Sequence, residues 1–167
     1  MLHLILALFT IFATWKWGDW KNWHKYHSSM IYIAMGNLLY AYLYDGHHLW
    51  QYNADLLVFN HFIADTLTTF IILPLTALIF LTKYPDTFKG QLFRVVKFIT
   101  IYFLIEVVYD MLGIFGYNYG WNIWWSLAWL FMMFPMLVLH HKKPLIAYGA
   151  SSIAVIIMLL LFPVSFN

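Results

Sequence analysis

Long apolar stretches alternate with short polar connections along the chain. Six stretches come close to the roughly 20 apolar residues that an α-helix needs to cross a bilayer. They cover residues 1–15, 28–44, 62–82, 98–117, 121–139 and 144–164. The pattern predicts an all-α fold, a polytopic membrane helix bundle with about six transmembrane helices. Since no linker or low-complexity segment divides the chain, we expect residues 1–167 to form a single integral membrane domain.

The first stretch, residues 1–15, is the shortest of the six. As a helix it would be about 22 Å long, which is less than the hydrocarbon core of a bilayer requires. A spanning, a re-entrant and an interfacial placement therefore all remain open. A cleaved signal peptide fits less well, because such peptides carry positive charge before the apolar run, whereas here the lysines follow it.

The composition supports a membrane location. Hydrophobic residues make up 63% of the chain and charged residues only 10%, compared with about 25% charged residues in soluble domains. A surface with so few charges would aggregate in water, so the natural solvent is lipid. The chain has no cysteine, which excludes disulfides, thiolate metal sites and cysteine nucleophiles. The formal charge of +2 is too small to suggest a nucleic-acid partner.

The positions of the positive charges predict the orientation. All nine lysine and arginine residues fall in alternate connections: Lys16, Lys21 and Lys25 after the first stretch, Lys83, Lys89, Arg94 and Lys97 after the third, and Lys142 and Lys143 after the fifth. By the positive-inside rule, these three connections are cytoplasmic. The two chain ends, the 45–61 connection and the 117–121 turn are then outside, so we predict an N-out and C-out protein.

Three acidic residues fall within the predicted spans, where an acid costs about 2.5–3.5 kcal/mol on insertion scales. Asp65 follows His61 by four positions, and Asp110 follows Glu106 by four, so each pair shares one helix face. Counted from the outer helix ends, Asp65 and Asp110 lie about 8–10 Å deep and Glu106 about 16 Å deep. Such residues usually face the bundle interior and find partners there.

Uncharged polar residues on other helices reach the same level. Asn37 and Tyr40 share a face of the 28–44 helix, and Asn122 lies near the outer end of the 121–139 helix. If these faces converge, they form a polar ligand cavity that opens to the outer side. Its predicted lining is Asn37, Tyr40, His61, Asp65, Glu106, Asp110 and Asn122.

The leading hypothesis is a non-enzymatic membrane protein that binds a small ligand, a lipid or a partner in this cavity. One alternative is a metal-dependent intramembrane enzyme, since imidazole and carboxylate ligands suit Zn, Mn or Fe. Its divalent metal would be bound by His61, Asp65, Glu106 and Asp110. Two nearby carboxylates could also form an acid–base pair that acts on lipid without a metal.

Two other interpretations remain. A small proton-coupled transporter would use Glu106 or Asp65 as its proton carrier, and its short chain would favour a homo-oligomer. A purely structural role would use the acids for interhelical hydrogen bonds. Such bonds average only about 0.6 kcal/mol, which is less than the insertion cost, so structure alone explains the acids poorly. No residue is assigned a catalytic role.

His140, His141, Lys142 and Lys143 form a basic corner on the predicted cytoplasmic side. Such a corner could attract anionic lipid headgroups, at about 1 kcal/mol per basic residue near the surface. Positive-inside topology explains the same residues without any ligand, and we favour that interpretation.

Several short segments carry a family resemblance. They are Trp-Lys-Trp-Gly-Asp-Trp-Lys at 15–21, Gly-Asn-Leu-Leu-Tyr at 36–40, Asn60-His61 with Asp65, Gly-Trp-Asn-Ile-Trp-Trp-Ser at 120–126, Phe134-Pro135 and Lys143-Pro144-Leu145. In these segments the chain resembles a family of small multi-spanning membrane proteins of endospore-forming Gram-positive bacteria. The resemblance covers most of the chain and implies a multi-pass location in the bacterial cytoplasmic membrane, but it supplies no substrate and no catalytic residue.

The chain departs from that family at one place. The resemblance leads us to expect an arginine just before the histidine that precedes Lys-Pro-Leu. Here the positions read Val138-Leu139-His140-His141. The departure weakens the case for a fixed anion site at this corner.

Overall fold

The computed structural model describes residues 2–53 and 61–164 and is predominantly helical. Seven α-helices occur in this part: α1 (Leu2–Trp17), α2 (His27–Leu43), α3 (His61–Leu67), α4 (Leu73–Leu81), α5 (Phe88–Met111), α6 (Ile123–Lys142) and α7 (Pro144–Leu161). A 3₁₀ helix, η1 (Trp20–Lys25), precedes α2, and a π-helix, η3 (Thr68–Ile72), joins α3 to α4. Two short strands, β1 (Trp50–Tyr52) and β2 (Phe115–Tyr117), pair antiparallel.

Three helical segments are long and apolar enough to cross a membrane: Phe62–Leu81, Ile123–Lys142 and Pro144–Leu161. A fourth, His3–Trp17, is apolar but shorter. Helix α2 has 17 residues, and α5 has 24 but carries charged side chains in both halves. The structure therefore shows a mostly helical chain with several helices of membrane length, while the count of six spans stays a prediction.

Helix α5 differs most from its predicted range of 98–117. It begins at Phe88, where the Thr87 hydroxyl accepts a hydrogen bond from the Gly90 amide and so caps the first turn. It ends at Met111, because Gly113 adopts a φ of +67°, the left-handed conformation that commonly ends helices. The prediction of helix over 112–117 is therefore wrong: the chain turns there and continues into β2.

The two strands form a small aromatic cap at one end of the bundle. Trp50 is paired with Tyr117, and Tyr52 with Phe115. Main-chain hydrogen bonds continue the ladder on both sides, from Asn53 to Ile114 and from Asn118 to Leu49. Aromatic residues favour extended backbone because their side chains fit a pleated, half-buried surface. An alternating aromatic pattern in both connections is therefore the sequence signal for this pair.

A π-helical segment interrupts the long helix just before a proline. Pro74 has no amide hydrogen and its ring crowds the carbonyl of Phe70, four residues earlier. The π-helix η3 ends at Ile72, so the wider turns lie directly ahead of Pro74. Pro135, by contrast, lies inside α6 without ending the helix.

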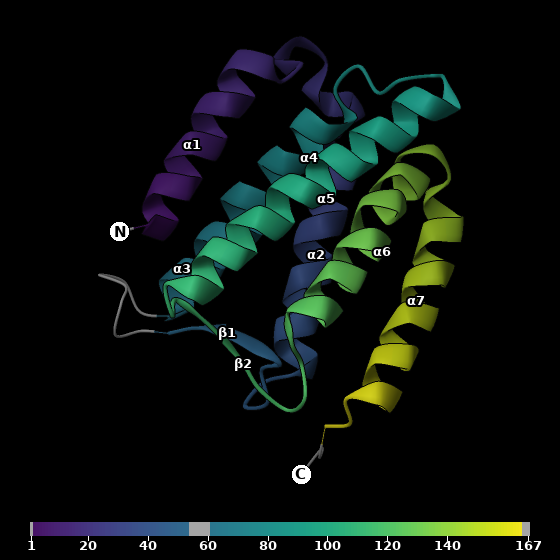
Figure 1. The fold of residues 1–167 in the computed structure, drawn as a ribbon. Helices are drawn as coiled ribbons and strands as arrows, with labels where there is room; N and C mark the ends of the chain where they lie inside the picture. Colours follow the sequence, from purple (N-terminus) through teal and green to yellow (C-terminus); the bar gives the residue numbers. More distant parts are fainter. Residues whose placement is uncertain (1, 54–60, 165–167) are drawn as a thin grey trace.

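The helices form one bundle in which α1 and α7 lie at opposite edges (Figure 1). Helix α2 packs against α4 and α6, α5 packs against α6, and α6 packs against α7. Helix α1 packs against η3 and α4. The β1–β2 pair lies at the end of the bundle where α2 ends and α3 begins (Figure 1).

Buried apolar side chains lie between α4 and α6, while much of the outer surface is also apolar. Phe80 and Leu78 of α4 are fully buried together with Phe134 and Leu137 of α6. On the outside of α7, however, Leu160 is 77% exposed. Soluble monomers rarely expose large contiguous apolar surface, so this outer face suits lipid better than water.

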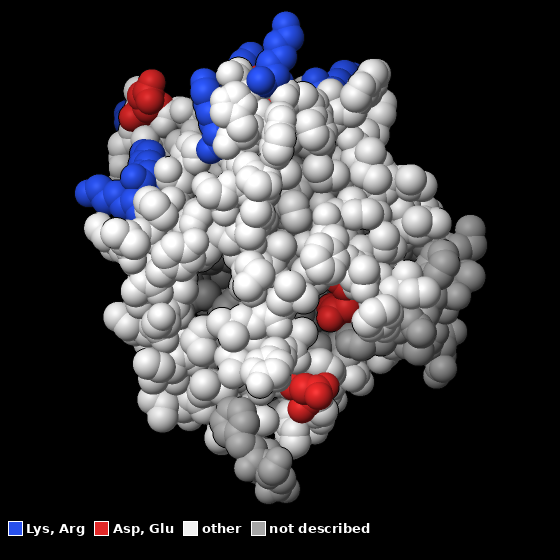
Figure 2. Space-filling model, turned by 180° about the vertical axis from the view of Figure 1, so that it is seen from behind, with Lys and Arg blue, Asp and Glu red and all other residues white. Residues whose placement is uncertain are grey.

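Positive side chains gather at one end of the face seen in Figure 2. The nine lysine and arginine residues lie in the connections that join α1 to α2, α4 to α5 and α6 to α7 or in the adjoining parts of the helices. These three connections lie together at the end opposite the strand pair (Figure 1). This is the charge asymmetry from which we predicted the orientation in the membrane.

Candidate functional site

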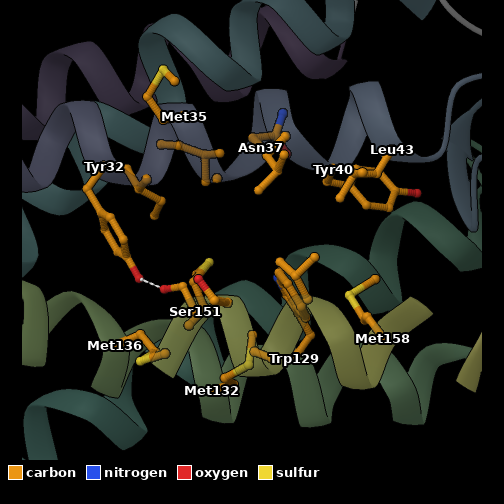
Figure 3. Close-up of a pocket in the computed structure, with 18 of the residues that line it drawn as sticks. Tyr32, Met35, Asn37, Tyr40, Leu43, Trp129, Met132, Met136, Ser151 and Met158 are labelled. Atoms are coloured by element: carbon orange, nitrogen blue, oxygen red, sulfur yellow. Dashed lines mark hydrogen bonds between the residues drawn. The ribbon is translucent and has the colours of Figure 1, made fainter. Parts of the chain in front are cut away.

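A groove of about 560 Å³ lies between α2, α6 and α7. It is lined by Tyr32, Ile33, Met35, Gly36, Asn37, Leu39, Tyr40, Leu43 and Tyr44 of the α2 segment, Trp50, Leu73, Trp129, Met132, Met133, Met136 and Leu137, and Tyr148, Ser151, Ser152, Ala154, Val155, Ile156 and Met158 of α7. Figure 3 shows α2 on one side of this space and α6 and α7 on the other. The surface is hollowed on the face that Figure 2 presents.

The walls of the groove are mostly apolar and rich in methionine. Met132 and Met136 come from α6, Met35 from α2 and Met158 from α7 (Figure 3). Methionine is unbranched and polarizable, so it adapts to ligands of irregular shape. A space with this lining accommodates hydrocarbon better than a polar solute.

A polar network closes the end of the groove nearest the lysines. The Tyr32 hydroxyl and Ser151 Oγ are 2.6 Å apart across the space between α2 and α7 (Figure 3). The Tyr32 ring stacks on His140, with ring centroids 4.1 Å apart. The ring nitrogens of His140 lie 3.1 Å from Ser29 Oγ and 3.3 Å from the Tyr148 hydroxyl. These contacts hold α2, α6 and α7 in register at this end.

Aromatic rings close the opposite end, next to the strand pair. The Tyr40 hydroxyl accepts hydrogen bonds from the amides of Leu49 and Trp50, at 3.0 and 3.3 Å. Its ring stacks on Trp50, with centroids 3.8 Å apart and planes 4° from parallel. The Tyr44 hydroxyl donates to the carbonyl of Phe162, 3.2 Å away. The groove therefore has two fixed ends and an apolar middle.

Two of the seven predicted site residues, Asn37 and Tyr40, line this groove. The Asn37 amide donates to Thr69 Oγ1 at 2.8 Å, and in Figure 3 its nitrogen points away from the groove. Asn37 thus ties α2 to the π-helical segment η3. Asp65, half-buried on α3, contributes its carbonyl to a hydrogen bond from Thr69, at 2.8 Å.

Glu106 and its neighbours form a separate contact between α5 and the strand pair. Glu106 is half-buried and accepts a 2.9 Å hydrogen bond from the Tyr117 hydroxyl. Burial raises the pKa of the Tyr117 phenol above its ordinary value, and the nearby Glu106 carboxylate raises it further. Tyr117 therefore stays protonated and remains a donor. Asp110 is exposed one turn further along α5.

The remaining two predicted residues are Asn122 and His61, and neither lines the groove in the described part of the chain. Asn122 is exposed and caps α6, because its Oδ1 accepts from the amides of Trp124 and Trp125 at 3.0 and 3.4 Å. The side chain of His61 lies outside the described residues. Among the predicted residues that the structure describes, Asn37 and Tyr40 thus line a groove wall, Glu106 contacts a strand and Asn122 caps a helix.

The described part of the chain offers no group of three or more His, Asp and Glu residues that could hold a metal ion. Three of the four predicted metal ligands, Asp65, Glu106 and Asp110, belong to that part, while the His61 side chain does not. The metal site remains a prediction that these contacts do not support.

His3 is a buried polar residue that the sequence analysis did not single out. Only 3% of it is exposed, and its Nε2 lies 3.0 Å from the carbonyl of Ala64 and 2.9 Å from Thr68 Oγ1. Because a carbonyl oxygen can only accept, Nε2 carries the hydrogen. The other ring nitrogen lies 3.5 Å from the Tyr109 hydroxyl, and the ring packs against Tyr52 at 4.7 Å.

The sequence does contain a signal for His3. Five small or polar residues of α1 are buried: His3, Ala7, Thr10, Ala13 and Thr14. This spacing marks one face of a helix, and in a membrane helix a stripe of small and polar residues marks the packing face. The stripe shows that α1 belongs to the bundle and places His3 at its inward-facing start.

Comparison with protein families, with curated proteins and with solved structures finds no match to this chain.

Proposed function

We propose that this chain is a multi-pass protein of the cytoplasmic membrane that binds the hydrocarbon part of a lipid-like amphiphile between α2, α6 and α7. The observation that carries the proposal is the groove itself, which has a volume of about 560 Å³ and mostly apolar walls. Ligand pockets in proteins typically measure about 300–1,000 Å³ and combine apolar walls with a few polar groups that fix orientation.

The length of the groove supports a chain-like ligand. Tyr32 and Tyr44 line its two ends on the α2 side, and along a helix these positions are about 18 Å apart. That distance is a little over half of the roughly 30 Å hydrocarbon thickness of a bilayer. An acyl or isoprenoid chain that lies parallel to the helices fits such a space.

The rim of the groove supports entry from the membrane. Met35 on α2 and Ile156 on α7 line it and are 58% and 57% exposed. In the proposed six-span topology these side chains lie at the depth of lipid tails, so a lipid can slide in sideways without crossing water. Ser151 and Ser152 supply polar groups on α7 toward the Tyr32 end, where the polar part of an amphiphile would lie.

The experiment is native mass spectrometry of the gently solubilised protein, with two matched glycine variants. A Cβ atom added at Gly36 meets no atom within 4 Å, and the same holds at Gly149. Gly36 lines the groove and Gly149 of α7 does not. We expect Gly36→Phe to fill the groove and lose the bound lipid-like molecule, and Gly149→Phe to keep it, with both variants folded.

Two results would overturn the proposal. One is a wild-type protein that carries no lipid-like molecule after mild solubilisation and binds none when it is added back. The other is equal retention by the Gly36 and Gly149 variants. The same spectra report metal, so a stoichiometric metal lost on Asp65→Asn or Glu106→Gln would favour the metal-dependent enzyme instead.

A further inference from the structure

A second pocket, of about 380 Å³, lies at the lysine-rich end of the bundle. It is lined by Lys25, Tyr26, Leu81, Lys83, Tyr84, Pro85, Asp86, Val138, His141 and Lys142. These residues come from three connections that are far apart in the sequence, namely those before α2, after α4 and at the end of α6. The fold therefore brings three lysines, Lys25, Lys83 and Lys142, to one hollow.

Aromatic contacts hold the walls of this pocket. The rings of Tyr26 and His141 stack with centroids 5.6 Å apart, which ties the start of α2 to the end of α6. The ammonium of Lys142 lies 5.6 Å from the centre of the Tyr84 ring, a cation–π distance. This contact orients Lys142 toward the α4–α5 connection.

The backbone also holds Lys83 in place. Lys83 adopts a φ of +48°, a left-handed backbone conformation that residues other than glycine adopt rarely. The guanidinium of Arg94 donates to the Lys83 carbonyl at 3.5 Å and to the Ile79 carbonyl at 3.4 Å. Arg94 on α5 thus braces the turn that presents Lys83 to the pocket.

The lining of the pocket has a net positive charge, since it contains three lysines and one acid, Asp86. We propose that it binds the phosphate group of a phosphate ester, with Lys25, Lys83 and Lys142 as the ligands. Lysine ammonium groups are compact charges with three donors each, and hydrogen bonds between such cations and phosphate are strong because both partners are ionised. The phosphate ester is an anionic lipid headgroup or a soluble molecule, and the experiment distinguishes the two.

This site is separate from the lipid groove. Both use α6, but the groove is completed by α2 and α7, and the basic pocket by the residues just before α2 and by the α4–α5 connection. The basic pocket is also larger than the basic corner formed by residues 140–143, because two of its three lysines come from other connections. Failure of one proposal therefore leaves the other standing.

The test measures binding of phosphatidylglycerol and phosphatidylcholine to the full chain in dodecyl maltoside, by native mass spectrometry. The variants are Lys25→Gln, Lys83→Gln and Lys142→Gln. The controls are Lys89→Gln, Lys97→Gln and Lys143→Gln, which remove the same charge from the same end of the bundle outside the pocket. We expect phosphatidylglycerol to bind in preference to phosphatidylcholine, and each pocket variant to bind it about fivefold more weakly.

The outcomes are distinct. Equal weakening by pocket and control variants overturns the proposal, because binding then follows the general surface charge. Equal binding of the two lipids, with no binding of glycerol phosphate, overturns it as well. If glycerol phosphate binds alone and is lost in the pocket variants, the site takes a soluble phosphate ester. Lys142→Arg keeps the charge and should retain binding, which would assign the loss in Lys142→Gln to the missing charge.

Discussion

His3 shows what a single buried polar side chain can do in this bundle. It lies near the start of α1, yet its ring contacts α3, η3, α5 and β1 through Ala64, Thr68, Tyr109 and Tyr52. In the described part of the chain, every buried side-chain nitrogen and oxygen has a hydrogen-bond partner. Removal of one partner from such a network leaves others unsatisfied, which costs more than the bond itself is worth.

We predict that His3→Ala destabilises the protein by about 1–2 kcal/mol, because interhelical hydrogen bonds in membranes contribute about 0.6 kcal/mol on average and up to about 1.7. Thermal unfolding in detergent, followed by circular dichroism, measures the change. His24→Ala is the control, since His24 is exposed on η1. A His3 variant as stable as this control would show that the network does not contribute to stability.

The sequence predicted which polar residues are unusual, but not where their side chains go. Helical spacing places residues on one face of their own helix, so Glu106 was expected to face the bundle interior, and in the structure it is half-buried. Its partner Tyr117 lies in β2, a strand at a position where the hydrophobic pattern predicts helix. Asn122 could have been recognised as a cap, because asparagine just before an apolar run is a typical helix start.

At the scale of elements, Asn122 determines how α6 begins. Its side chain accepts hydrogen bonds from two amides of the first turn, and these amides have no partner within the helix. We predict that Asn122→Ala lowers the free energy of unfolding by about 1 kcal/mol. Asn122→Asp should restore most of it, since aspartate caps helices about as well as asparagine does.

Thermal unfolding and lipid binding of the Asn122 variants, measured together, also separate two roles for Asn122. A cap affects thermal stability and leaves lipid binding unchanged, whereas a cavity residue affects binding. If Asn122→Ala binds the lipid-like ligand more weakly at unchanged stability, the role in a ligand cavity would be favoured over the cap.

Helix ends account for most of the difference between predicted and observed elements. The hydrophobic pattern predicted each long helix, because apolar segments of this length are stable only in lipid or in a protein core. It did not locate the first part of α5, where Lys89, Arg94 and Lys97 alternate with apolar residues. It also missed the strand pair, because each strand has only three residues and depends on pairing with a segment far away in the sequence.

At the scale of the whole molecule, two asymmetries coincide. The positive residues lie at one end of the bundle and the strand pair lies at the other (Figures 1 and 2). The groove runs between these ends and the basic pocket lies at the positive one. With the orientation that the positive-inside rule predicts, the proposed phosphate pocket would lie at the inner surface of the membrane, where anionic lipids attract basic side chains.

The orientation itself gives the last prediction. The chain has no cysteine, so single cysteines can be introduced without a background signal. Asp45 and Tyr119 are exposed at the strand end, and Asp86 is exposed at the lysine end. In intact cells, a membrane-impermeant maleimide should label Asp45→Cys and Tyr119→Cys, and should label Asp86→Cys only after permeabilisation.

Each of these three positions lies between different helices, so the labelling pattern also tests the crossings. Labelling of both strand-end cysteines from outside, with position 86 protected, requires that the helix before position 86 and the helix after it both cross the membrane. The positive-inside rule predicts that pattern, because four of the nine positive residues lie between positions 83 and 97, in the α4–α5 connection and the first part of α5. Labelling of Asp86→Cys in intact cells, with the other two cysteines protected, would show the opposite orientation, in which the phosphate pocket lies outside.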